Sequence, residues 1–245
     1  MNDAPIFIYD SGLGGLSVLA KVINIVPKER FVYFGDNGNA PYGSRTDDDL
    51  FSIVKKNCGF IKMYKPKLIV AACNTLSVDF LPYIEEFTGV KSFGVFPPIS
   101  KRGYPGRKVL LLATERTCAK YGGIAGLDLA PLRSLAGDIE KNAFNLEAVD
   151  IDEHLKNCGS GFKDEKKYYD EIILGCTHYF FVKNKILNHF CPQKITDGGD
   201  FTAKMVSEYL EKQKSSVNNR GFSLKFVGKS ATFNRKFYFS VVRNL

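Results

Sequence analysis

The sequence has no apolar run that approaches the length of a membrane span. A transmembrane helix needs roughly 20 consecutive apolar residues, whereas apolar runs here, such as LIVAAC at 68–73, are far shorter. The first residues, MNDAPIFIYDSG, also lack the basic segment and long apolar stretch of a signal peptide. The sequence therefore predicts a protein of the cytoplasm with no membrane partner.

The sequence also lacks any Cys-x-x-Cys pair, although it contains six cysteines. A cytosolic chain of 245 residues needs no disulfide framework to stabilise its core. One metal-binding alternative arises from CTH at 176–178 and HFC at 189–191, which supply two thiols and two imidazoles. Their spacing matches no common zinc pattern, so no metal is expected.

No complete nucleotide-binding motif is present. The segment DSGLGGLS at 10–17 follows a predicted strand and opens a predicted helix, but Ser17 stands where a dinucleotide fingerprint has its third glycine. Asp36 ends the next strand, where a ribose-binding acid would lie, so a nicotinamide site stays an alternative. No Gly-Lys-Ser/Thr follows. We expect no cofactor, and a loop suited to a small anion such as a carboxylate.

A dedicated nucleic-acid signature is also missing. The chain has 34 Lys and Arg against 26 Asp and Glu, a formal charge of +8, but the basic residues are scattered along it. A solvated basic surface that attracts small anions explains this charge, so no nucleic-acid partner is expected. Hydrophobic content of 44% and charged content of 24% are ordinary for a globular protein.

What the sequence does contain is an alternation of strands and helices. Strands are predicted at 4–10, 30–36, 66–73 and 91–96, and again after a linker-like segment at 108–114 and 170–176. Helices are predicted between them, with Pro82 interrupting one at 77–87, a poor helix at 117–127 and a helical segment with a Gly-rich interruption at 152–170. Near-continuous apolar strands separated by helices predict an α/β fold with mainly parallel sheets flanked by helices.

Two of these strands end on a cysteine. Cys73 ends LIVAAC, and Cys176 ends EIILGC. The carboxyl ends of parallel strands face the ligand crevice, so two similar units facing each other would place both thiols in one cleft. Such a cleft suits chemistry that needs a proton acceptor on one face of a substrate and a proton donor on the other. For either cysteine alone, packing at a strand end would be the simpler explanation.

Four motifs carry a resemblance to a known family. DSGLGG (10–15), GDNGNAPYGSR (35–45), ACNT (72–75) and GCTHY (175–179), in this order and spacing, resemble the glutamate racemases. These are cofactor-independent enzymes of the aspartate/glutamate racemase superfamily. The resemblance implies two pseudo-symmetric α/β domains, residues 1–95 with 200–245 and residues 96–199, and an active site in the cleft between them.

The resemblance also implies roles for individual residues. Cys73 and Cys176 would be the catalytic acid/bases, Asp10 and His178 would assist them, and Glu140 in SLAGDIEKN would orient His178. The residues that would bind the amino acid are Ser11, Pro41, Tyr42, Gly43, Ser44, Asn74, Thr75 and Thr177. Asp36 is a possible support for this site, or only a turn residue, and Asp10 can also cap the helix that follows it.

The proposed chemistry makes specific demands on these groups. A free thiol has a pKa of roughly 8.5, so the thiol that removes the α-proton must be drawn toward thiolate by its surroundings. The other thiol must stay protonated, and the two roles exchange for the opposite enantiomer. His178 is placed to stabilise a thiolate at Cys176, whereas a carboxylate at Asp10 would raise the pKa of Cys73. This tension is open at the level of sequence.

Some positions depart from the family pattern, namely Phe180 in place of proline, Pro97 in place of an acidic or small residue, and Lys120 in place of serine. The expected activity is racemisation of L- and D-glutamate, supplying D-glutamate for peptidoglycan synthesis, by a homodimer. The alternatives are a racemase for aspartate or another amino acid, and a catalytically weak homologue that acts as a binding or regulatory protein.

Overall fold

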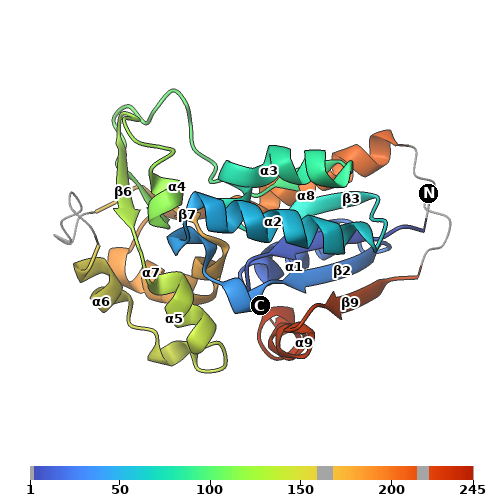
Figure 1. Cartoon of the computed structure of the whole chain (residues 1–245). Coiled ribbons are helices and arrows are strands. Elements are labelled where there is room, and N and C mark those ends of the chain that lie inside the picture. The colour runs from blue at the N-terminus through green and yellow to red at the C-terminus, as the bar shows by residue number, and fades with distance from the viewer. Residues whose placement is uncertain (1–2, 159–167, 214–220, 245) are drawn as a thin grey trace.

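The computed structural model describes residues 3–158, 168–213 and 221–244. These residues form two lobes, and each lobe is built on its own parallel sheet with helices beside it (Figure 1). The predicted α/β class with parallel sheets is therefore confirmed. No helix in this described part of the chain is both long and apolar enough to cross a membrane.

The first sheet has five strands in the order β4-β3-β1-β2-β9, and every neighbouring pair is parallel. Its strands are β1 Ile6–Asp10, β2 Arg30–Gly35, β3 Leu68–Ala71, β4 Ser92–Gly94 and β9 Ser223–Val227. In the pairing of β1 with β2, Asp10 is level with Gly35. In the pairing of β1 with β3, Tyr9 is level with Ala71. The carboxyl ends of β1, β2 and β3 therefore lie at one edge of the sheet.

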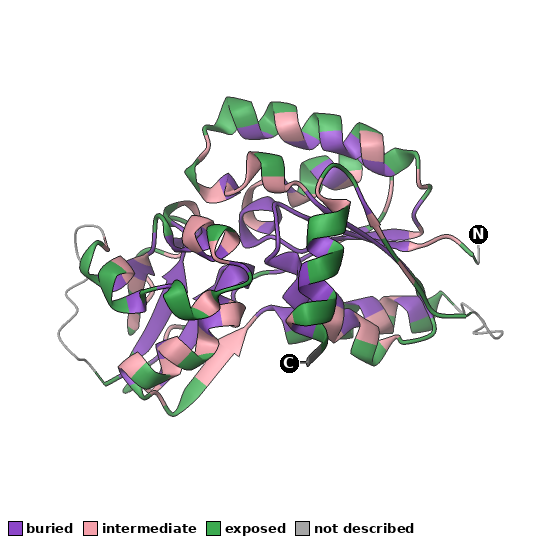
Figure 2. Ribbon diagram, turned by 90° about the horizontal axis from the view of Figure 1, so that it is seen from below, coloured by how far each residue is buried: buried purple, intermediate pink, exposed green. Residues whose placement is uncertain are grey.

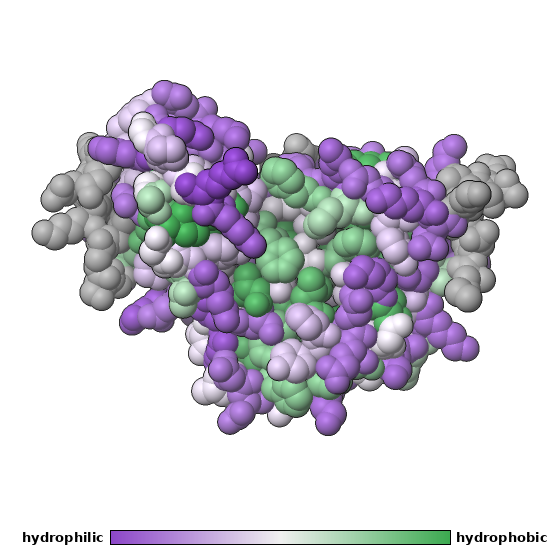
Figure 3. All heavy atoms as spheres, turned by 90° about the horizontal axis from the view of Figure 1, so that it is seen from above, coloured by the Kyte–Doolittle hydropathy of each residue, from purple (hydrophilic) through white to green (hydrophobic). Residues whose placement is uncertain are grey.

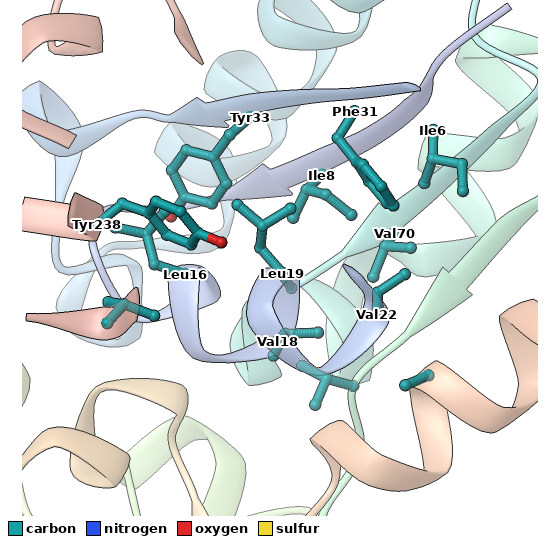
Figure 4. Packing of buried hydrophobic residues seen from close by; sticks show 14 of the residues in the cluster. Ile6, Ile8, Leu16, Val18, Leu19, Val22, Phe31, Tyr33, Val70 and Tyr238 are labelled. Carbon is teal, nitrogen blue, oxygen red and sulfur yellow. The ribbon is translucent and has the colours of Figure 1, made fainter. Parts of the chain in front are cut away.

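Helices cover both faces of this sheet, which is why its strands are apolar at successive positions. Alternate residues of β1 point to opposite faces: Ile6 and Ile8 pack against α1 Gly15–Ile25, α8 Gly199–Lys212 and α9 Ala231–Ser240. Figure 4 shows Leu16 and Leu19 of α1 directed at these strands. Phe7 and the other odd positions pack against α2 Asp47–Lys62 and α3 Asn74–Thr88.

Local signals set the ends of the covering helices. The Thr46 side chain accepts a hydrogen bond from the Asp49 N–H at 3.3 Å, and three aspartates fill the first turn of α2, where negative charge is favourable. Helix α3 ends at Gly89, whose φ of 68° requires the left-handed region. Each of these helices has a buried face and an exposed face, as the burial colouring of Figure 2 shows.

The second sheet has four parallel strands in the order β6-β5-β7-β8. Its strands are β5 Val109–Ala113, β6 Leu127–Pro131, β7 Glu171–Gly175 and β8 Lys194–Asp197. Its helices are α4 Glu115–Cys118, α5 Leu135–Lys141, α6 Ile151–Lys156 and α7 Lys183–Phe190. The 3-10 turns of the chain are η1 Asn37–Asn39, η2 Tyr42–Ser44, η3 Leu146–Ala148, η4 Thr177–Val182 and η5 Val242–Asn244.

Three expectations from the sequence need correction. Helix α3 runs through Pro82 without a break. The segment 117–127 is not a helix, because α4 ends at Cys118 and turns lead to the edge strand β6, whose start at Leu127 was not anticipated. The segment predicted to be helical at 152–170 contributes only α6 among described residues, since 159–167 lie outside them.

The division into domains 1–95 with 200–245 and 96–199 stays a prediction. The sheets support it, because β9 returns to the sheet of β1–β4 while β5–β8 form the other sheet. The lobes also contact each other directly: Lys21 of α1 forms an ion pair with Asp197 at the end of β8 (2.7 Å). The carboxyl ends of β1, β2 and β3 lie at the edge of the first sheet that faces the second sheet.

Candidate active site

Both strand-ending cysteines lie at helix starts that face this edge. Cys73 follows β3 and precedes α3, and Cys176 follows β7 and precedes η4. Each thiol residue is only 7% exposed, and the charge of Cys176 is among the influences on the pKa of Cys73. The structure thus brings together two buried thiols from two lobes, as the strand pattern suggested.

Asp10 ends β1 and is fully buried beside the glycine loop. One carboxylate oxygen, Oδ2, accepts hydrogen bonds from the N–H groups of Gly12 (3.0 Å) and Gly15 (2.9 Å), so it fixes the loop and the start of α1. The other oxygen, Oδ1, is buried and has no hydrogen-bond partner among the described residues. Burial raises the pKa of Asp10, and the nearby charge of His178 opposes that rise.

Cys73 is held as a thiol. Burial, with the Asp10 carboxylate adding to it, raises the pKa of Cys73 to about 12. The Ser11 hydroxyl lies 3.5 Å from Sγ and is its side-chain hydrogen-bond donor. The effect of Asp10 anticipated from the sequence is therefore present, and Cys73 is in the state required of a proton donor.

Cys176 has a different neighbour. The Nδ1 atom of His178 lies 3.8 Å from Sγ, and the opposite ring nitrogen, Nε2, lies 2.7 Å from Oε1 of Glu140. Burial lowers the pKa of His178, but the contacts with Cys176 and Glu140 outweigh burial and leave it well above its ordinary value. A cationic imidazole between a carboxylate and a thiol favours negative charge on that thiol.

Glu140 belongs to α5, and its carboxylate contacts the other lobe. Oε1 also accepts from the Leu13 N–H at 2.5 Å, and Oε2 accepts from the Asn37 amide at 2.9 Å. Burial raises the pKa of Glu140, but these hydrogen bonds and His178 together hold it below its usual value. The loose alignment of SLAGDIEKN thus placed Glu140 next to His178, where the structure also has it.

Three polar residues follow the cysteines directly. Asn74, Thr75 and Thr177 are all buried, and the Asn74 amide donates to the Val95 carbonyl (3.1 Å) while its own oxygen has no partner among described residues. A cavity of about 10 Å³ lies beside Cys176 and is lined by both Asn74 and Thr177. This space beside Cys176 has room for about one water molecule.

The turn at 41–44 approaches the cleft with its backbone rather than with all its side chains. A Cβ atom on Gly43 would lie 2.8 Å from the Thr114 side chain of the second lobe, so glycine permits this close contact. Pro41 lies against α5 near Gly137. Ser44 is exposed and, with Pro41, lines an open surface cavity of about 450 Å³ rather than the buried space at the thiols.

Tyr42 points away from the cleft. Its hydroxyl donates to Asp36 (2.7 Å) and lies 3.0 Å from the Tyr9 hydroxyl inside the first lobe. The Asn57 amide donates to the same Asp36 carboxylate at 2.9 Å. Asp36 is therefore the centre of a hydrogen-bond network that shapes the 41–44 turn, which agrees with a supporting position and not with contact to a ligand.

Sequence reasoning missed several residues of this site. Asn37 holds Glu140, Thr114 packs against Gly43, and a Cβ on Gly14 would lie 2.4 Å from Thr177 Oγ1. Asn37 lies inside the quoted motif GDNGNAPYGSR, so its position was a usable signal. Gly14 likewise lies inside the quoted motif DSGLGG, whereas Thr114 gave no local signal, because its contact is made with the other lobe.

The alternative metal site is not assembled. Among the described residues there is no group of three or more His, Cys, Asp or Glu side chains placed to hold a metal ion. His178 faces Glu140, whereas His189 contacts Asp152 (2.6 Å) and Cys191 is exposed.

Two of the three departures from the family pattern lie at contacts between the lobes. Lys120 forms an ion pair with Asp79 of α3 (2.7 Å). Phe180 lies beneath the Lys21 ammonium, 5.4 Å from the ring centroid, and close to the Asp197 side of the cleft. Pro97 is buried at the crossing between the lobes, next to the space beside Gly175.

Known proteins resemble this chain along most of its length. No family model matches it. A glutamate racemase of Clostridium perfringens is 32% identical over 249 residues, covering 96% of this chain and 92% of that protein. A glutamate racemase of Thermus thermophilus is 33% identical over 214 residues, covering 85% of this chain and 80% of that protein. The chain belongs to the glutamate racemase family.

Solved structures of this family share the fold described above. A glutamate racemase isoform of Bacillus anthracis has a TM-score of 0.76 at 25% identity, covering 95% of this chain and 92% of that one. The Thermus thermophilus glutamate racemase in complex with β-chloro-D-alanine has a TM-score of 0.75 at 29% identity, covering 97% and 93%. The four motifs quoted from the sequence therefore identified the family correctly.

Proposed function

We propose that this chain interconverts L- and D-glutamate without a cofactor, with Cys73 and Cys176 as the two acid/bases. The observation that carries the proposal is the pair of buried thiols at equivalent strand ends of the two lobes, each with a different charged neighbour. One thiol removes the α-proton from one face of the amino acid, and the other delivers a proton to the opposite face.

The neighbours give each thiol its starting role. Cationic His178 beside Cys176 stabilises the negative charge that this sulfur carries as a base. Cys73, whose pKa burial and Asp10 raise to about 12, begins as the proton donor. For the opposite enantiomer the roles exchange, and the ammonium group of the substrate supplies positive charge close to Asp10 and Cys73.

Two buried oxygens without partners support a position for that ammonium group. Asp10 Oδ1 and Asn74 Oδ1 are acceptors with no donor among the described residues. A substrate ammonium group that reaches either oxygen would satisfy it, and an unsatisfied buried acceptor costs about 1–3 kcal/mol. The first N–H groups of α3, around Thr75, have no partners within the helix and suit a substrate carboxylate.

The lobes must separate for the substrate to enter. The cavity of about 10 Å³ beside Cys176 is too small for an amino acid, so the described arrangement corresponds to a closed state. Closure excludes water from the thiols, which strengthens every electrostatic interaction between them and the substrate.

Exchange of either thiol tests the proposal. Cys73→Ser and Cys176→Ser should each abolish racemisation, measured by circular dichroism starting from each enantiomer, because each face then lacks its proton-transfer group. Each variant should still eliminate acid from a substrate with a β leaving group when its remaining thiol is the base, since elimination needs only one base. Cys191→Ser, which changes an exposed thiol, serves as the control. Full racemisation by Cys73→Ser or Cys176→Ser would disprove the two-thiol mechanism.

The same assay distinguishes glutamate from the alternative substrate, aspartate. Discrimination by one methylene through apolar contact alone gives roughly 10–200-fold. An aspartate whose side-chain carboxylate cannot reach its hydrogen-bond donors loses more binding free energy than that, because buried donors are left unpaired. We therefore expect kcat/KM for glutamate to exceed that for aspartate by more than about a hundredfold. Equal rates or a preference for aspartate would assign the chain the alternative activity with the same two thiols.

The wider assignments are part of this proposal: supply of D-glutamate for peptidoglycan, a place in the cytoplasm, and a homodimer. Support for a homodimer comes from large apolar side chains that are exposed on α2, α3 and α8, namely Phe51, Tyr83, Phe201 and Met205. Figure 3 shows apolar side chains gathered on the face seen from above. Light scattering at assay concentration tests this assembly, and a monomer mass would remove it.

A further inference from the structure

A chain of hydrogen bonds connects α9 with the candidate catalytic histidine. The Asn234 amide donates to Asn37 Oδ1 at 2.9 Å, and the Asn37 amide donates to Glu140 Oε2 at 2.9 Å. Glu140 Oε1 lies 2.7 Å from His178 Nε2, and His178 Nδ1 lies 3.8 Å from Cys176 Sγ. The path therefore begins in the first lobe, crosses to α5 of the second lobe and ends at a thiol.

The direction of these hydrogen bonds is fixed by chemistry. An ionised carboxylate can only accept hydrogen bonds, so Asn37 must turn its NH₂ group toward Glu140. Its carbonyl oxygen then faces Asn234 and requires a donor there, which the Asn234 amide supplies. An aspartate or an apolar residue at position 37 or 234 would break this donor-to-acceptor order of the hydrogen bonds.

Packing alone does not account for an asparagine at 234. The residue is fully buried, and its own carbonyl oxygen has no partner among the described residues. A buried unsatisfied acceptor destabilises the fold relative to an apolar side chain of the same shape. The backbone of β2 also makes room for it, since a Cβ atom on Gly35 would lie 2.7 Å from Asn234 Nδ2 and 3.1 Å from Asn37 Oδ1.

We propose that Asn37 and Asn234 are positioning residues for proton transfer at Cys176, because they hold the Glu140 carboxylate ionised and aimed at His178. The inference rests on the proposed racemase function of the same site. It makes α9, at the far end of the sequence, part of the apparatus that sets the protonation of His178. Neither asparagine touches the thiols, so both act only through Glu140.

The test uses apolar side chains of matching shape. Asn37→Leu and Asn234→Leu remove the relay while keeping the volume nearly constant. Asn142→Leu is the matched control, because Asn142 caps the same helix α5 but donates to Asp138 (2.8 Å) instead of Glu140. Thermal melting is measured for each. Asn234→Leu removes one buried unpaired oxygen but leaves Asn37 Oδ1 without its donor, so the two effects oppose each other and its melting temperature should stay close to that of the natural protein.

Elimination from the two enantiomers of threo-3-chloroglutamate separates positioning from a general loss of structure. In this reaction the α-proton moves to a thiolate, the C–Cl bond breaks, chloride leaves and a C=C bond forms. The Cys73→Ser variant identifies the enantiomer that Cys176 serves. We expect Asn37→Leu to slow elimination from that enantiomer at least tenfold more than from the other, and Asn234→Leu to do so at least threefold. Racemisation kcat/KM must fall equally in both directions, since the two enantiomers are equal in free energy.

A second readout follows the charge on His178. Loss of the Asn37 donor weakens the Glu140–His178 contact that keeps the pKa of His178 raised, so the alkaline limb of the racemisation profile should move to lower pH. The inference would be overturned by equal slowing of both eliminations, by an unchanged alkaline limb of the pH profile, or by the same difference between the two eliminations in Asn142→Leu.

If the natural protein racemises no amino acid, the proposed function fails. Titration of His178 by ¹⁵N NMR in Asn37→Leu then decides the positioning role alone, with an unshifted pKa counting against it.

Discussion

At the scale of single residues, the site differs from a symmetric pair of thiols. Cys73 lies beside the Ser11 hydroxyl and a carboxylate, whereas Cys176 lies beside an imidazole that is itself paired with Glu140. A two-base racemase needs one thiol in each protonation state, and these neighbours give the two thiols different electrostatic surroundings. The sequence had shown both thiols as strand-end residues and left the role of Asp10 unresolved.

The pair formed by His178 and Glu140 predicts a pH dependence of stability. The pKa of His178 is raised on folding, so its contribution is fully present below its unfolded value of roughly 6.5 and is lost as pH rises through the folded value. The pKa of Glu140 is lowered, so its contribution is present above roughly 4.3 and is lost as pH falls through the folded value. The pair therefore stabilises the fold most between about pH 4.3 and 6.5.

His178→Leu should accordingly destabilise the protein most inside that window. Removing one partner of a buried pair costs up to about 3–5 kcal/mol, and the lower end applies because Glu140 keeps the Leu13 and Asn37 donors. Urea unfolding from pH 4 to 9 measures the difference from the natural protein. His154→Leu, at a pair with Asp138, is the control. A difference that grows steadily above pH 7 would contradict the assigned charges.

At the scale of elements, the glycine loop before α1 (residues 12–15) packs tightly against the other lobe. A Cβ on Gly12 would lie 1.8 Å from Glu140 Oε1, and one on Gly14 would lie 2.5 Å from His178 Nδ1. The sequence had suggested that these glycines leave room for a small anion. The structure shows that they leave room for Glu140, Thr177 and His178 of the other lobe.

Gly14→Ala should therefore impair catalysis without unfolding the protein. The added methyl group would push Thr177 or His178 away, and a misplacement of about 1 Å costs about a hundredfold in rate. Gly59→Ala is the control, because no atom lies within 4 Å of a Cβ there and alanine favours helix α2 by about 0.5–1 kcal/mol. Steady-state racemisation and thermal melting are measured for both. Unimpaired kcat/KM in Gly14→Ala would show that the loop is free to move.

At the scale of the whole molecule, ion pairs on two sides hold the lobes together. Lys21 of the first lobe contacts Asp197 of the second at 2.7 Å, and Asp200 of its own lobe also binds Lys21 at 2.9 Å. On the other side, Arg116 and Lys120 both contact Asp79, at 3.2 and 2.7 Å. The unusual lysine at 120 thus adds a charge to a contact between lobes, which links this departure to opening and closing of the cleft.

Asp79→Asn should weaken closure. Because two cations lose their shared partner, and each such pair contributes about 0.2–1 kcal/mol, we expect KM to rise by about two- to tenfold. Salt screens such pairs, so kcat/KM of the natural protein should fall between about 0.05 and 0.5 M salt while that of Asp79→Asn changes less. Glu208→Gln, whose partner Lys204 lies on the same helix, is the control. Identical salt profiles would exclude this contact from closure.

The sequence by itself determined the fold class, the family and the positions of the two thiols. It could do so because apolar strands, the glycine loop and the strand-end motifs are local patterns, and the carboxyl ends of parallel strands always meet a ligand at one edge. Glu140 and His178 also followed from motifs, although the Glu140 alignment was loose.

Only the tertiary structure decided which groups surround those thiols. Tyr42 lies in a motif that suggested substrate contact, yet its hydroxyl binds Asp36 inside the first lobe. Asn234 and Asn37 lie 197 positions apart and meet only because β9 and α9 return to the first sheet beside β2. Hydrogen bonds between distant segments depend on how sheets and lobes pack, and no local pattern along the chain encodes that packing.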